Sequence, residues 1–267
     1  MAINALQSAA SGLSALNTSL DVIAHNLANV NTPGFKASRA NFQDLLYIEK
    51  AQPGTENANG DQRPTGLLVG LGVKVSGTQN SFIQGAPLAT GQPYDLMIEG
   101  DGFFQVGVEA ELGGTAYTRA GNFVLNSERQ LVLANDQGRR LQPEIVIPDN
   151  ATNVQIGADG QVLVTIPGEA APQPVGTIEL ATFVNPAGLK TVGENLFIET
   201  AASGAPVTGE PGTDRRGKLK QGFLESSNVD PTRELIELIR TQRAFEMNSQ
   251  SIRAADEALR SIAQLRR

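Results

Sequence analysis

The sequence predicts an α+β fold in which two long terminal helices pair as a coiled coil and an antiparallel β-rich body is inserted between them. Over residues 4–30 an apolar or small side chain recurs at alternating intervals of three and four, the spacing of a helix that packs against another over many turns. The same spacing recurs over residues 232–265. Between the two stretches, short apolar runs alternate with turns rich in Gly, Asn and Asp, which is typical of antiparallel sheets.

The N-terminal helix is expected from about Asn4 to Val30. Residues 1–35 contain one carboxylate, Asp21, and neither lysine nor arginine. Because a helix on the surface of a monomer normally carries charge on its outer face, we predict that other helices enclose this one. Its predicted contact positions are Leu6, Ala9, Leu13, Leu16, Leu20, Ile23, Leu27 and Val30.

The C-terminal helix is expected from Thr232 to Leu265, and its outer face carries many arginines and glutamates. The contrast predicts that the N-terminal helix lies inside and the C-terminal helix outside. Two arrangements remain open: an antiparallel helix pair that closes a monomer, and self-assembly in which copies enclose one another's N-terminal helices. The predicted contact positions are Leu238, Thr241, Phe245, Asn248, Ile252, Ala255, Leu259 and Ile262.

The segment after the first helix begins with a turn sequence, NTPG at residues 31–34. Proline disfavours the helical conformation in the residue before it, and glycine tolerates positive φ, so the helix should end here. The apolar cluster over residues 42–47 is compatible with a short helix. Residues 49–66 are polar and rich in Pro, Gly and Asn, and a loop of this length is usually either functional or disordered.

The β-rich body is expected from Leu67 onward. Hairpins are predicted over residues 123–133 and 154–164, a tight turn over 99–102, and further strands over 178–183 and 196–198. We therefore predict three regions: a terminal helical assembly domain (1–30 and 230–267), a connecting domain (31–92 and 205–229, including the extended loop 49–66), and a β-rich outer domain (93–204).

The composition argues against several classes of function. The net charge is −7, the isoelectric point is about 4.9 and the cationic side chains are scattered, so nucleic acid is not an expected partner. The chain has no cysteine, which excludes disulfides, thiolate catalysis and zinc–thiolate sites. We expect no membrane span and no cleaved secretory signal, because the sequence contains neither 18 consecutive apolar residues nor a signal-like N-terminus.

No catalytic, cofactor or metal site is predicted. His25 is the single histidine, so a catalytic triad would depend on it, yet it lies on the predicted assembly helix. Glu99 and Asp101 could form a carboxylate pair for acid–base catalysis, but Glu-Gly-Asp-Gly is also a turn sequence, and we favour the turn. The common nucleotide-binding and hydrolase motifs are absent from the sequence. We therefore expect a protein that is not an enzyme.

Residues 19–36, SLDVIAHNLANVNTPGFK, resemble the signature shared by bacterial flagellar rod and hook proteins. His25 departs from it, since the family usually has Asn or a small polar residue there. Further stretches resemble the distal-rod members of this family: 42–47 with 52–54 and 64–66, 99–106 with 117–123, and 221–229 with 241–246. The signature positions are Asn26, Leu27, Ala28, Asn29, Thr32, Pro33, Gly34 and Phe35.

The resemblance implies a structural subunit of the flagellar basal body that polymerises into a hollow, straight, stiff helical tube. Such a tube crosses the periplasm, transmits torque and serves as an export channel. The implied partners are other copies of the chain, the proximal rod proteins, the hook protein, the periplasmic and outer-membrane bushing rings, and the flagellar type III export apparatus. The resemblance also implies that the extended loop stiffens the rod through Gln52, Pro53, Gly54 and Pro64, and we expect this loop to order on assembly.

Two other interpretations remain open from the sequence. A proximal rod or hook protein would share the signature, but the bendable hook lacks the segment over residues 49–66. A secreted ligand-binding β domain with a helical stalk would instead be a monomer with a ligand cleft.

Overall fold

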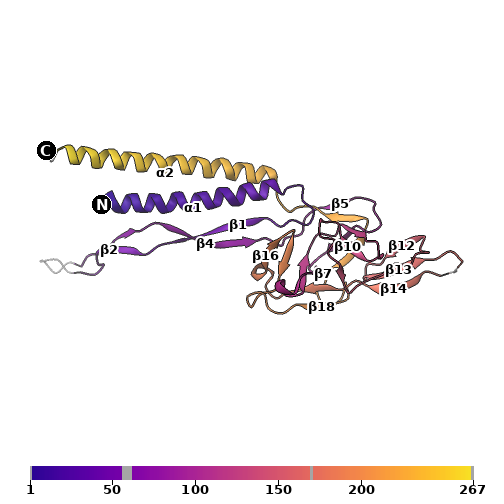
Figure 1. Cartoon of the computed structure of the whole chain (residues 1–267). Helices are drawn as coiled ribbons and strands as arrows, with labels where there is room; N and C mark the ends of the chain where they lie inside the picture. Colours follow the sequence, from indigo (N-terminus) through magenta and orange to yellow (C-terminus); the bar gives the residue numbers. More distant parts are fainter. Residues whose placement is uncertain (1, 56–61, 169–170, 266–267) are drawn as a thin grey trace. The chain divides into compact units, whose positions relative to one another are not determined.

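The computed structural model describes residues 2–55, 62–168 and 171–265, and the predicted α+β fold is confirmed. Two long helices near the chain ends pack against each other, and the strands between them pair antiparallel (Figure 1). The chain divides into two compact units. The helical unit comprises Met1–Ala28, Ser38–Asn80 and Asp230–Arg267, and the β unit comprises Asn29–Ala37 and Ser81–Val229. The finer division into three regions stays a prediction.

In the helical unit, α1 (Ala2–Ala28) and α2 (Pro231–Leu265) lie side by side and antiparallel (Figure 1). Asp230 caps α2, because its Oδ1 accepts a hydrogen bond from the amide of Thr232 at 2.9 Å and Pro231 fits the first helical position. Helix α1 also contacts the ribbon of β1 (Ser38–Asp44) and β4 (Val73–Asn80). A second ribbon pairs β2 (Tyr47–Ala51) with β3 (Leu67–Gly70).

The prediction of a short helix over residues 42–47 was wrong. Phe42 lies in β1, opposite Val75 of β4, and Tyr47 begins β2, opposite Gly70 of β3. The backbone groups of this segment find partners in distant strands, and that pairing outweighs a local helix too short to be stable alone. The boundary of the predicted loop also shifts, because residues 49–51 belong to β2, and β3 begins at Leu67.

The β unit contains a seven-stranded sheet, a three-stranded sheet and three strand pairs. In the seven-stranded sheet the neighbouring strands are β16 (Lys190–Gly193), β17 (Leu196–Ile198), β8 (Thr115–Thr118), β7 (Phe103–Gly107), β15 (Leu180–Thr182) and β18 (Val207–Gly209), with β11 (Leu141–Gln142) also on β7. The three-stranded sheet is β12 (Asn153–Ile156), β13 (Gln161–Thr165) and β14 (Gln173–Thr177). The pairs are β9 (Phe123–Leu125) with β10 (Leu131–Leu133), β6 (Leu96–Glu99) with β19 (Lys218–Gln221), and β5 (Pro87–Ala89) with β20 (Phe223–Glu225). Two short 3₁₀ helices are η1 (Ala110–Leu112) and η2 (Pro186–Gly188).

Both predicted hairpins are confirmed, as β9–β10 and β12–β13. Between β6 and β7 the chain bends at residues 100–102, where Gly100 (φ 111°) and Gly102 (φ 142°) adopt positive φ, which only glycine does readily, and Asp101 forms an isolated bridge with Arg216. The flanking strands do not pair with each other, because β6 joins β19 while β7 joins β8, β11 and β15. The core beneath them includes the fully buried Leu96, Phe104, Leu141, Ile178 and Leu180.

Candidate assembly surface

The predicted contact positions of α1 are only partly covered by the helical unit itself. Ile23 is buried and so is Ala15, but the leucines at positions 6, 13, 16, 20 and 27 remain half-buried. Val30 follows the end of α1 and is also half-buried. A leucine gains about 1.5–3 kcal/mol when it is buried completely, so this row of side chains still has apolar surface to bury.

The predicted positions on α2 that the structure describes differ in burial. Thr241 is buried, and Leu238, Phe245 and Ile252 are half-buried. The helices approach closely at Gly12, where a Cβ atom would lie 3.2 Å from Nδ2 of Asn248. Leu259 and Ile262 also belong to α2, but their side chains lie outside the described residues.

The sequence predicts a charged outer face for α2, but in the structure exposed apolar side chains also lie on this helix. Leu235, Ile236, Ile239 and Met247 are each about half exposed or more, with exposed fractions of 47%, 50%, 47% and 62%. Leu235 and Ile239 are four residues apart, so they share one side of the helix. This i, i+4 pair was visible in the sequence and marks a second apolar face on α2.

Asn26, a signature residue, joins three segments of the helical unit. Its Nδ2 donates hydrogen bonds to the carbonyl of Ser38 (2.8 Å) and to Oε1 of Glu234 (3.3 Å), and its Oδ1 accepts one from the amide of Ser38 (2.9 Å). The last turn of α1, the start of β1 and the first turn of α2 are thereby connected. Burial raises the pKa of Glu234 above its ordinary value, and the hydrogen bond from Asn26 opposes that rise.

Signature residues that follow α1 form the predicted turn. The amide and hydroxyl of Thr32 both donate to Asn29, and the amide of Phe35 donates to the carbonyl of Thr32 at 3.2 Å. Gly34 has φ of 72°, and a Cβ atom there would lie 2.6 Å from the amide nitrogen of Ala120. Glycine is therefore required on both conformational and steric grounds. Of the remaining signature residues, Pro33 and Leu27 are half-buried and Ala28 is exposed.

A buried ion cluster, formed by Lys36, Arg119 and Glu225, holds this turn in the β unit. Nζ of Lys36 lies 2.6 Å from Oε1 of Glu225, and Nη1 of Arg119 lies 3.5 Å from Oε2. Burial lowers the pKa of Lys36 and Glu225 opposes that effect; the same two causes act on the pKa of Arg119. Sequence reasoning missed this cluster, although each of its members lies in or beside a stretch that carries the family resemblance.

The loop between β2 and β3 is described at its two ends. Gly54, with φ of 79°, donates a hydrogen bond to the carbonyl of Arg63 at 2.8 Å. The predicted loop residues Gln52, Pro53, Gly54 and Pro64 are all exposed, whereas residues 56–61 lie outside the described part of the chain. Exposed apolar side chains flank the loop: Leu46 (82%), Tyr47 (56%), Leu67 (54%) and Leu68 (57%).

The described residues offer no group of three or more His, Asp or Glu side chains that could bind a metal ion. His25 is exposed on α1, and Glu99 and Asp101 are exposed at their turn. None of the helices in the described ranges is both long and apolar enough to cross a membrane.

Comparison with known proteins identifies the family. Residues 6–36 match the model described as flagella basal body rod protein, residues 97–164 the flagellar hook protein FlgE/F/G D1 domain, and residues 220–265 the flagellar basal body rod FlgEFG protein C-terminal region. The chain is 46% identical to the flagellar basal-body rod protein FlgG of Caulobacter vibrioides over 265 residues, covering 99% of this chain and 100% of the relative.

The FlgG protein of Borreliella burgdorferi is 42% identical over 267 residues, with 99% of both chains covered. The FlgF protein of Caulobacter vibrioides is 35% identical over 271 residues, covering 98% of this chain and 97% of the relative. Within that one organism, FlgG is therefore the more similar relative. The chain belongs to the FlgG family of flagellar basal-body rod proteins.

Proposed function

We propose that this chain polymerises through its terminal helices into the hollow, straight, stiff tube of the flagellar distal rod. As a member of the FlgG family it is a structural component of the basal-body rod and not an enzyme. The observation that carries the mode of assembly is the incomplete burial of both helices. Among the described apolar side chains of the helical unit, only Ala15 and Ile23 are buried.

Helix α1 would supply the inner contacts of the tube. Its leucines are half-buried, and among residues 2–28 it carries a single carboxylate and no lysine or arginine. A helix with so few charged side chains is poorly suited to water on its uncovered side. Neighbouring subunits that cover Leu6, Leu13, Leu16, Leu20 and Leu27 would complete the burial that α2, β1 and β4 begin.

Helix α2 would contact neighbours through its second apolar face, formed by Leu235, Ile236, Ile239 and Met247. Each of these side chains is 47% exposed or more, so α1 leaves about half of their surface or more uncovered. An apolar face of this kind on a helix that is otherwise charged is typical of a surface that binds another protein. Leu238, Phe245, Ile252, Leu259 and Ile262 would hold α2 to α1 and to the next copy of α1.

The loop over residues 52–66 would restrict bending. Two-stranded ribbons such as β2–β3 are marginally stable alone, and this one exposes Tyr47, Leu67 and Leu68. We infer that these side chains, with Gln52, Pro53, Gly54 and Pro64, pack between neighbouring subunits. A bridge at that place would oppose the sliding that a curved tube needs, which favours the rod over the bendable hook.

The further partners follow from the place of the distal rod in the flagellum. We propose contacts with the proximal rod proteins at one end and the hook protein at the other, passage through the periplasmic and outer-membrane bushing rings, and delivery by the flagellar type III export apparatus.

A charge placed on α1 tests the proposal. Leu20→Asp should abolish tube formation, because the carboxylate would be buried between helices without a partner. Val124→Asp, at a 43% exposed position of the β unit, is the matched control and should assemble normally. Electron microscopy and sedimentation of concentrated full-length protein measure assembly, and circular dichroism checks the fold. Normal tubes from Leu20→Asp would refute α1 as the contact.

A further inference from the structure

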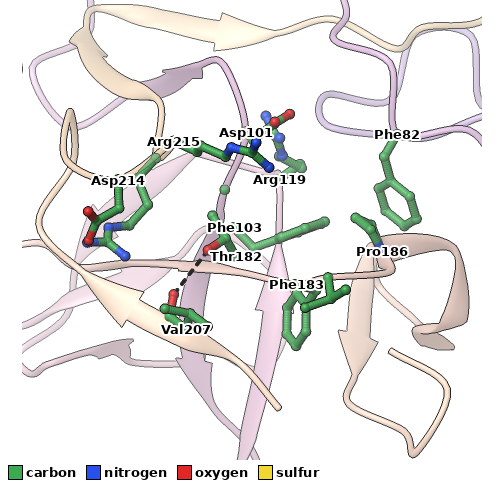
Figure 2. Close-up of a pocket in the computed structure, with 13 residues that line it drawn as sticks. Phe82, Asp101, Phe103, Arg119, Thr182, Phe183, Pro186, Val207, Asp214 and Arg215 are labelled. Carbon is green, nitrogen blue, oxygen red and sulfur yellow. Dashed lines mark hydrogen bonds and ion pairs between the residues drawn. The ribbon is translucent and has the colours of Figure 1, made fainter. Parts of the chain in front are cut away.

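A cavity of about 460 Å³ lies in the β unit (Figure 2). None of the residues that line it belongs to the two helices or to the signature turn. Its apolar wall is a cluster of Phe82, Phe103 and Phe183, whose rings meet edge to face with centroids 5.3 Å (Phe82–Phe103) and 5.8 Å (Phe103–Phe183) apart. Cavities of about 300–1,000 Å³ with apolar walls and a few polar groups are the usual form of a binding site.

The polar end of the cavity is formed by Arg119, whose side chain is 3% exposed. Its guanidinium lies 5.2 Å from the centre of the Phe103 ring. Among the described residues, Nε of Arg119 has no hydrogen-bond partner, and the contact of Nη1 with Glu225 is long at 3.5 Å. Glu225 also pairs with Lys36 at 2.6 Å, so its single negative charge is shared between two cations. A buried donor without a partner is unfavourable and is rare in native structures.

The charges around the cavity favour an anion. Three arginines (119, 215 and 216) and two aspartates (101 and 214) line it. Arg216 is already paired, because its Nη2 lies 3.0 Å from Asp214 and 2.8 Å from the hydroxyl of Thr213. Asp101 acts electrostatically on Arg119. The lining therefore has one more positive than negative charge, in a place with apolar walls.

The rim of the cavity is apolar and open. Val184 is 89% exposed and Val207 is 54% exposed, and both line the cavity. A group that enters must therefore bring apolar surface next to its negative charge, since a carboxylate alone would leave the valines and phenylalanines uncovered. An acidic side chain beside a bulky apolar side chain on a polypeptide has this character.

We propose that this cavity receives a carboxylate side chain and its apolar neighbour from a second copy of this chain. The proposal rests on the self-assembly proposed above and adds a contact of the β unit to those of the helices. Charge complementarity supports the identity of the partner. The chain carries a net charge of −7, so a second copy presents an excess of carboxylates to a cavity with excess positive charge.

Substitution at the rim tests the contact without disturbing the core. Val184→Glu would place a negative charge at the mouth of the cavity, and Val184→Gln is the uncharged variant of equal size. Val146→Glu, at a 50% exposed position elsewhere in the β unit, controls for added charge. We expect Val184→Glu to raise the critical concentration for tube formation about tenfold, because like charges brought together in an interface oppose binding. Val184→Gln and Val146→Glu should assemble like the wild type.

Equal assembly by Val184→Glu and Val184→Gln, or an equal loss in Val146→Glu, would overturn the proposal. If the wild type itself formed no tubes, the proposed function would be refuted, but this result would not test the cavity. Binding of a small molecule then tests whether the cavity accepts a carboxylate. N-acetyl-L-phenylalanine pairs a carboxylate with a phenyl ring, and its amide is the neutral analogue. Nuclear magnetic resonance titration of the full-length monomer should show the acid binding about tenfold more tightly than the amide, and Val184→Glu should remove that difference. Equal binding of acid and amide to the wild type would overturn the inference.

Discussion

Glu225→Gln is the most informative perturbation of the β unit. Glu225 is the only carboxylate of the buried ion cluster, and it accepts hydrogen bonds from Lys36 (2.6 Å), from Arg119 (3.5 Å) and from the amide of Gly85 (2.8 Å). Glutamine has the same size, and its oxygen can still accept from Lys36 and Gly85. Its amide nitrogen would face Arg119, so two donors would oppose each other and two buried cations would lose their counterion.

The expected magnitude follows from the burial of all three side chains. Lys36 and Glu225 have no exposed side-chain surface, and Arg119 has 3%. Removing one partner of a buried ion pair lowers the free energy of unfolding by about 3–5 kcal/mol, because the remaining charge is stabilised neither by a counterion nor by water. For a domain of this size, 1 kcal/mol corresponds to about 2–4 °C in the melting temperature, so Glu225→Gln should melt about 6–20 °C lower.

Differential scanning calorimetry of the full-length monomer measures this change. Glu128→Gln is the control, since Glu128 pairs with Arg140 on the surface and its loss should change the free energy of unfolding by no more than about 1 kcal/mol. The double variant Glu225→Gln with Lys36→Met should recover part of the loss, because one unpaired cation is gone. A melting temperature for Glu225→Gln within about 2 °C of the wild type would refute the cluster as a source of stability.

Two further substitutions test the turn and the helix junction. Gly34→Ala should lower the free energy of unfolding by about 1–3 kcal/mol, because the residue has positive φ and its Cβ atom would clash with Ala120. The control is Gly113→Ala, since Gly113 has φ of 95° but open space around it, and its loss should be smaller. Chemical denaturation measures both. The pKa of Glu234 is raised, so the folded state binds more protons than the unfolded state just above pH 4.5, and the helical unit should gain stability as the pH falls through that window. Glu234→Gln keeps the acceptor for Asn26 and should flatten this pH dependence, whereas an unchanged pH profile, followed by the helical circular dichroism signal, would contradict the assignment.

Regular local patterns made the helices and hairpins predictable. The intervals of three and four over residues 4–30 identify α1 because each turn repeats the same information, and the turn residues at 126–130 and 157–160 identify hairpins whose partners are adjacent in sequence. Strand β1 was not predictable in this way. Its partner β4 lies beyond the loop, and the pairing of Phe42 with Val75 is a long-range contact that no local sequence pattern indicates.

The buried ion cluster shows the same limit more strongly. Lys36 and Glu225 are separated by 189 positions, and Lys36 and Arg119 each look like an ordinary surface cation in the sequence. The resemblance to flagellar proteins selected the stretches that hold all three residues, but it gave no physical reason for their presence together. The predicted contact leucines of α1 lie on the helix as expected, and their role between subunits stays a proposal.

The two units differ in how far each can be stable alone, and that difference bears on assembly. The β unit buries an extensive apolar core and pairs the buried Lys36 and Glu225 within itself, so we expect it to fold without a neighbour. The helical unit buries only two apolar side chains among its described residues, and isolated helices draw most of their stability from packing. Subunits that meet would therefore gain most where the helices are incompletely covered, and polymerisation would stabilise the helical unit more than the β unit, whose gain is confined to the cavity contact proposed above. A subunit built in this way can stay soluble and folded in its β unit before assembly and still gain a large free energy from joining a tube.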